Sequence, residues 1–247
     1  MNIGGRALKN GIMFQSDNYI VKARYNSDGK ITITEESTSF VLDNWLVRFL
    51  SSLPFLRSLV ALLRILWDSK KVLIITCIIV IPVTMLLEKY NIINDSNIDE
   101  INTGFQYFYI IFIFFLFWLI YRIYGKFHGA EHKAINTYLE FGKVEIKQVK
   151  KATRISSRCG TNLVFIVIML KIITLGLHIN SPIVNLSVWM IAYEIFELQE
   201  TKLAFLSKPF IKIGEFFQKL TTAEPTTYEL EPAVIGINRL IQLEKSI

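Results

Sequence analysis

The most apolar stretch of the chain is FQYFYIIFIFFLFWLIY, residues 105–121. It contains no charged residue, and its length approaches the roughly 20 residues that a helix needs to cross a bilayer. The hexapeptide His128-Gly129-Ala130-Glu131-His132-Lys133 begins seven residues after it. The sequence therefore predicts a transmembrane helix followed by two histidines and a carboxylate at the membrane surface.

Three further apolar segments complete the predicted membrane domain, at residues 72–87, 163–179 and 183–199. The last two contain Lys171 and Glu194, so each also fits a buried or re-entrant helix. With 52% apolar and 19% charged residues and a mean hydropathy of +0.39, the chain is expected to alternate bilayer segments with solvated ones. We therefore predict a mainly α membrane protein with about four transmembrane helices, cytoplasmic amphipathic helices and a small N-terminal antiparallel β-sheet.

The distribution of basic residues predicts the orientation of these segments. Of the 27 Lys and Arg residues, ten precede residue 72, nine lie within 122–158 and six follow residue 199, whereas 88–104 holds one basic against four acidic residues. Since basic loops stay on the cytoplasmic side, we expect a multi-pass protein of the cytoplasmic (inner) membrane with both termini cytoplasmic. The net charge of +6 then indicates contact with an anionic inner leaflet and not with nucleic acid.

Two other features concern targeting and redox environment. The first 40 residues show no apolar run behind a basic start, so no cleavable signal peptide is expected. The chain has only two cysteines, Cys77 and Cys159, which suggests no disulfide framework.

The N-terminal region has the pattern of a β-sheet. Residues 19–25 and 30–34 alternate in polarity around Asn26-Ser27-Asp28-Gly29, which predicts a hairpin, and residues 12–14 are a candidate third strand. The stretch between Gly4-Gly5 and Gly11 is expected to be helical.

The whole chain is predicted to have four parts. They are a β-rich cytoplasmic segment (1–42), amphipathic interfacial helices (43–71), a four-span membrane domain with a basic cytoplasmic loop at 122–161 (72–199), and C-terminal cytoplasmic amphipathic helices (200–247).

The hexapeptide supplies the candidate chemistry. On a helix, His128 and His132 share one face with Glu131 beside them, and the spacing H-x-x-E-H is that of the inverted zinc peptidases. Zinc binds imidazole, thiolate and carboxylate, so the expected ligands are the two histidines with either Cys159 or Glu194, both of which the predicted topology brings to the cytoplasmic side. Glu131 then remains as the general base on a metal-bound water.

A structural interpretation of the same residues is also open. His128 and His132 fit interfacial histidines that bond loop carbonyls, and a five-residue pattern has a real false-positive rate. Cys159 fits a small buried residue, and Glu194 fits a helix-to-helix ion pair with Lys171.

Several short motifs occur in order along the chain. They are Gly4-Gly5-Arg6-Ala7-Leu8-Lys9-Asn10-Gly11-Ile12-Met13, Pro54-Phe55-Leu56-Arg57, the hexapeptide at 128–133, Arg158-Cys159-Gly160-Thr161, Tyr193-Glu194 and Thr221-Thr222-Ala223-Glu224-Pro225. Together they resemble the YqhQ-like family of bacterial membrane proteins, which is generally described as predicted metal-dependent enzymes. Arg6 and Asn10 stand where that family usually has glutamine and an acidic residue.

Two functions follow as hypotheses. The first is a metal-dependent membrane enzyme of hydrolase type, with a divalent metal, most simply zinc, at the cytoplasmic membrane face. The alternative is a non-catalytic membrane factor that docks on a secretion or membrane-assembly complex.

Overall fold

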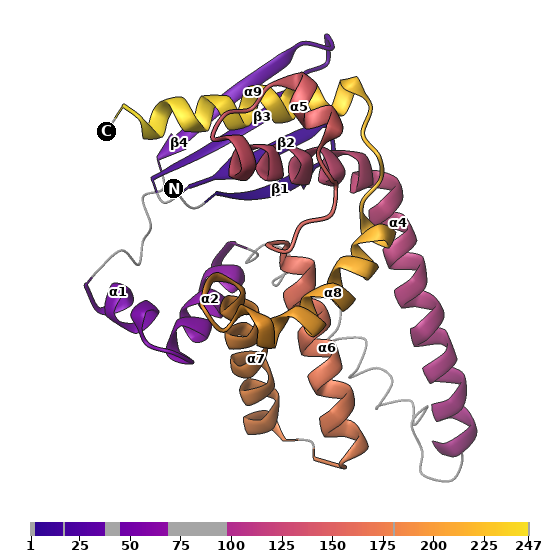
Figure 1. The fold of residues 1–247 in the computed structure, drawn as a ribbon. Coiled ribbons are helices and arrows are strands. Elements are labelled where there is room, and N and C mark those ends of the chain that lie inside the picture. The colour runs from indigo at the N-terminus through magenta and orange to yellow at the C-terminus, as the bar shows by residue number, and fades with distance from the viewer. Residues whose placement is uncertain (1–2, 17, 38–44, 69–97, 180, 247) are drawn as a thin grey trace. The chain divides into compact units, whose positions relative to one another are not determined.

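A computed structural model describes residues 3–16, 18–37, 45–68, 98–179 and 181–246 (Figure 1). The chain divides into two units, one made of Met1–Asp43 with Phe117–Ile247 and the other of Asn44–Leu116. The four-part division predicted from the sequence remains a prediction.

The N-terminal part of the first unit is a four-stranded antiparallel meander in the order β1-β2-β3-β4. The strands are β1 (Gly4–Leu8), β2 (Gly11–Gln15), β3 (Tyr19–Tyr25) and β4 (Ile31–Ser37). The hairpin expected around residues 26–29 is present as β3 and β4, with Ala23 opposite Ile33. The stretch after Gly4 is not helical as expected but forms β1, because it pairs with β2 along its whole length, from Gly4 opposite Gln15 to Leu8 opposite Gly11.

Helix α9 (Thr227–Glu244) and the C-terminal part of α4 (Ile98–Phe141) share a core with this sheet, and α5 (Ile146–Lys151) packs against α9. Alternate residues of the strands, such as Phe14 and Val21, are fully buried against Ala130, Ile237 and their neighbours in one apolar core. In Figure 1, α9 runs along the sheet beside β2 and β3, with which it is in contact. Gly236 permits this approach, because a Cβ there would lie 3.2 Å from side-chain atoms of Ala23 and Phe14.

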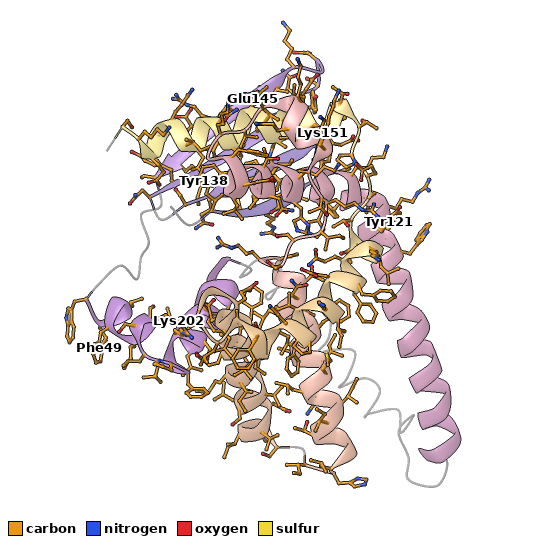
Figure 2. All side chains as sticks on the ribbon, in the orientation of Figure 1. Phe49, Tyr121, Tyr138, Glu145, Lys151 and Lys202 are labelled. Atoms are coloured by element: carbon orange, nitrogen blue, oxygen red, sulfur yellow. The ribbon has the colours of Figure 1, made fainter. Side chains whose placement is uncertain are left out.

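The ends of two of these helices are defined locally. α4 ends where Gly142 takes the left-handed conformation (φ 68°) and its N–H donates to the Tyr138 carbonyl. Figure 2 labels Tyr138, Glu145, which immediately precedes α5, and Lys151 at the end of α5. α9 begins with a capping box in which the Glu229 carboxylate accepts from the Thr226 backbone N–H.

The rest of the first unit is helical. α6 (Gly160–Gly176) packs against α7 (Pro182–Glu197) and α8 (Ala204–Thr221), with a short 3-10 turn, η1 (Leu198–Glu200), between the last two. Their shared core contains Ile166, Ala192 and Ile211. In the second unit, α1 (Trp45–Ser52) and α2 (Leu56–Asp68) are joined at Phe55, whose φ is 64°.

The predicted membrane topology is wrong. No helix among the described residues is at once long and apolar enough to cross a bilayer. α6 and α7 have 17 and 16 residues, fewer than the roughly 20 that a span needs, and they contain Lys171 and Glu194. Residues 105–121 are part of α4, and the expected span at 72–87 lies outside the described residues. The expected multi-pass protein of the cytoplasmic membrane, with both termini cytoplasmic, is thereby contradicted, and the described architecture is mixed α/β.

Candidate metal centre

Helix α4 brings the three hexapeptide side chains together. His128, Glu131 and His132 lie one turn apart on one face, as their spacing predicts. The Nε2 atom of each histidine is 3.9 Å from Glu131 Oε2, and the two imidazole rings meet edge to face with their centroids 4.4 Å apart. All three are well enclosed, since the side chains of His132 and Glu131 are 3% and 7% exposed and that of His128 is 17% exposed.

Backbone carbonyls fix the orientation of both imidazoles. His128 Nδ1 lies 3.2 Å from the Thr221 carbonyl oxygen and His132 Nδ1 lies 2.7 Å from that of Arg154. A carbonyl can only accept, so each Nδ1 is the protonated nitrogen and each Nε2 keeps its lone pair for the space between the rings. This arrangement, in which the far nitrogen of a ligand histidine is held by a carbonyl, is typical of metal sites.

Cys159 completes the cluster from the turn before α6. Its Sγ lies 3.6 Å from His128 Nε2, and the possible ligand atoms of His128, His132 and Cys159 all lie within 4.8 Å of one another. Tetrahedral zinc with Zn–N near 2.0 Å and Zn–S near 2.3 Å needs ligand separations of about 3.3 to 3.8 Å. The three residues therefore fit zinc after a contraction of about 1 Å, and a fourth position stays open.

Burial keeps this cluster uncharged while no cation is present. It raises the pKa of the Glu131 carboxyl to about 8 and that of the Cys159 thiol to about 11, the latter against the lowering effect of Thr161 hydrogen bonds. Burial also lowers the pKa of His132 to about 3, helped by His128, and lowers the pKa of His128. The imidazoles are thus neutral at pH 7 and ready to donate an electron pair.

The segment 221–225 holds the outer side of α4. Ala223 N–H donates to the Gly125 carbonyl at 2.8 Å, and a Cβ on Gly129 would collide with the Ala223 carbonyl oxygen. Glycine at 129 is thus required by the close approach that also lets the Thr221 carbonyl reach His128.

A buried amide holds the turn that carries Cys159. Gln218 of α8 accepts from Ser156 N–H at 2.9 Å, and its amide donates to the Ser156 carbonyl and to Asn162 Oδ1, both at 2.7 Å. Gln218 and Asn162 are fully buried. The amide therefore ties α8, α6 and the turn before α6 into one frame.

On the sheet side, the edge strand β1 closes the site. A Cβ on Gly5 would lie 2.6 Å from Glu131 Cγ and closer still to its Oε1, whereas one on Gly4 would meet nothing within 4 Å. Glycine at position 5 therefore lets the Glu131 carboxyl lie directly on the strand backbone.

A cavity of about 390 Å³ opens from this cluster. It is lined by residues of β1, the face of α4 and the turn before α6: Ile3, Gly4, Gly5, Arg6, Ala7, Tyr124, His128, Glu131, His132, Ile135, Ser156, Arg158, Cys159, Gly160 and Thr161. The cluster is thus open to a ligand from one side.

The structure brings some of the predicted site residues together and leaves others outside the cluster. It brings together His128, Glu131, His132 and Cys159, but Glu194, which is half-buried on α7, neither belongs to the grouped ligands nor lines the cavity. Asn10 also lies away from the cavity lining, and its amide donates to the Tyr25 carbonyl. Gly5 and Thr221 belong to the motifs quoted from the sequence, but their contacts with Glu131 and His128 were not predicted, and Gln218 was missed altogether. Only the paired glycines signalled a close backbone approach.

Comparison with known proteins places the chain in a family. The profile described as "Protein of unknown function (DUF1385)" matches residues 69–243. The chain belongs to this family. It is also 28% identical over 133 residues to the uncharacterized protein YqhQ of Bacillus subtilis (strain 168). The similarity covers 48% of this chain and 41% of that protein, so the chain spans less than half of this relative's length. The resemblance to YqhQ-like proteins is thereby confirmed, and no solved structure matches the chain.

Proposed function

We propose that this protein is a metal-dependent enzyme of hydrolase type that holds zinc through His128, His132 and Cys159. The observation that carries the proposal is the orientation of the two imidazoles, whose Nδ1 atoms are engaged by carbonyls while both Nε2 atoms face Glu131 and Cys159. A structural histidine pair needs no such convergence of three ligand atoms within 4.8 Å.

Glu131 is the proposed general base. Its Oε2 lies 3.9 Å from both Nε2 atoms, which is near enough to reach a water held between the imidazoles. Bound zinc would lower the pKa of such a water and, as a nearby cation, would favour the ionised carboxylate. Glu131 would then accept the proton of the water at Oε2.

The proposal is tested by the metal content of the full chain. We expect about one zinc per wild-type chain by elemental mass spectrometry, and strong loss of zinc in His132→Gln and Cys159→Ser. His178→Asn is the matched control, because His178 lies outside the cluster and asparagine tolerates its left-handed backbone (φ 56°).

A second variant separates binding from catalysis. Glu131→Gln keeps all three ligands and is expected to retain zinc while losing hydrolysis of whichever ester or amide the wild type accepts. A wild-type protein without zinc, manganese or iron, or one whose metal content ignores both ligand variants, would falsify the proposal.

A second candidate is a non-catalytic factor that docks on a larger protein assembly. Its support is the row of apolar side chains exposed on α6 and α7, among them Ile172 (64%), Ile173 (55%) and Ile183 (78%). Cross-linking in cells should then recover a stable partner that Ile172→Asp with Ile183→Asp abolishes. Recovery of the protein alone would count against this role.

A further inference from the structure

The cavity beside the His128–His132–Cys159 cluster is lined by two arginines that have no role in the proposed metal chemistry. Arg6 comes from the edge strand β1, and Arg158 from the turn immediately before Cys159. Both residues are exposed and line the same cavity. Two arginines from separate parts of the fold therefore contribute to the wall of this space.

The charge balance of the lining favours an anion. Glu131 is the one acidic residue among those that line the cavity, and its side chain is only 7% exposed. Lys133, the buried cation nearby in sequence, is paired with Glu224 and does not line the cavity. Within the described residues, no hydrogen bond or ion pair engages the guanidinium of Arg6.

The size of the cavity leaves room for more than a metal and its water. It measures about 390 Å³, whereas a water occupies about 30 Å³ in the liquid. Gly4 adds no side chain to the wall, and the space around its Cα is open. A group of phosphate size can therefore lie between the arginines and the cluster.

We propose that the cavity binds a phosphate-bearing ligand, whose phosphate oxygens are held by Arg6 and Arg158 beside the His128–His132–Cys159 cluster. The inference deepens the proposed function and rests on it, because it names the substrate class of that same site. Phosphate is favoured over carboxylate because its tetrahedral oxygens can accept from two guanidinium groups and a metal in different directions at once, whereas a carboxylate has only two oxygens, which lie in one plane.

The test is calorimetric titration of the zinc-loaded, full-length protein with phenyl phosphate and with benzoate. Phenyl phosphate should bind more tightly than benzoate, and Arg6→Gln and Arg158→Gln should each weaken it about tenfold, as expected for loss of one charge-assisted contact. Arg24→Gln is the matched control, since Arg24 is an exposed arginine on β3 that does not line the cavity. Zinc content is measured in every variant and should stay at the wild-type value.

Three outcomes would overturn the inference while the metal proposal survives. They are full zinc with no phenyl phosphate binding, full zinc with equal affinities in wild type and both arginine variants, and benzoate binding as tight as phenyl phosphate. Absence of zinc from the wild type contradicts the proposed function instead. The same titration of the metal-free protein then tests the arginines alone, and unchanged affinity in the variants refutes their role.

Discussion

Gly5→Ala tests whether β1 really closes the candidate site. The new Cβ would lie 2.6 Å from Glu131 Cγ, although Cβ contacts below 3.0 Å essentially never occur. Glu131 is buried on α4 and cannot retreat into solvent without leaving the cluster. Gly4→Ala is the internal control, because an added Cβ there meets nothing within 4 Å.

The expected changes in Tm differ between Gly5→Ala and Gly4→Ala. Overpacking of this kind costs about 1–3 kcal/mol, and in a protein of this size each kcal/mol shifts Tm by about 2–4 °C. We therefore expect Gly5→Ala to lower Tm by about 2–12 °C. Gly4→Ala should leave Tm unchanged or raise it by a few degrees, since alanine restricts the unfolded chain by about 0.4–1 kcal/mol.

Differential scanning calorimetry of the two variants in metal-free buffer measures this contrast directly. Gly5→Ala should also impair any hydrolytic activity of the protein, because the displaced carboxyl belongs to the proposed base. Equal Tm values for the two variants would show that β1 does not lie against Glu131, and the reasoning about the site would fail with it.

Three further predictions concern the same cluster. Since burial raises the pKa of Glu131 from 4.5 to about 8, the metal-free folded state holds a proton that the unfolded chain releases, so this carboxyl should lower the stability by about 4 kcal/mol between pH 4.5 and 8. The lowered pKa values of His128 and His132 act in the opposite direction below pH 6.5, so the contribution of Glu131 is the difference in pH dependence between wild type and Glu131→Gln in urea titrations. An identical pH dependence of the two proteins would contradict the assignment. Zinc affinity should rise by at least tenfold per pH unit between pH 6 and 8, because the Cys159 thiol with a pKa of about 11 must lose its proton on binding and the Glu131 carboxyl with a pKa of about 8 is favoured to ionise beside the cation. Calorimetry in two buffers measures the protons released, and Cys159→Ser should lower this slope by about tenfold per pH unit. Gln218→Leu leaves the buried Ser156 N–H without its acceptor and removes the Gln218 donor from Asn162 Oδ1, although the Ser156 carbonyl keeps the Asn162 amide. This variant should cost about 3 kcal/mol in urea unfolding, whereas Lys219→Gln on the exposed side of α8 should cost little.

The alternation of polar and apolar residues predicted the β3–β4 hairpin, which depends on local geometry. The alternation in residues 19–34 specifies β3 and β4, because side chains of a strand point to opposite faces and the Asn26–Gly29 stretch supports the turn. Hydropathy alone could not tell a bilayer span from another helix rich in apolar side chains, such as α6 or α7, of which one face packs in a core while other apolar side chains are exposed. Segments such as α6 and α7 were consequently assigned to a membrane, although both are short and carry charges.

In the candidate site, too, contacts within one helix could be predicted from the sequence, whereas contacts between distant segments could not. His128, Glu131 and His132 could be grouped from the sequence because positions three and four apart adjoin on any helix. Cys159 was expected nearby through a membrane topology that is wrong, and its position is instead due to the buried Gln218 amide that holds its turn. Glu194 was expected by the same topology and is not in the cluster. The Thr221 carbonyl carries no side-chain signal, so no pattern could have indicated its contact with His128.

The contact between His128 and the Thr221 carbonyl joins positions 93 residues apart, and Gly5 reaches the same cluster from the beginning of the chain. During synthesis, a ribosome-bound chain that stops before Thr221 lacks the acceptor that orients His128. The site can therefore mature only after the last part of α8 has left the exit tunnel. The zinc content of stalled chains of increasing length would thus report the chain length at which this part of the fold is complete.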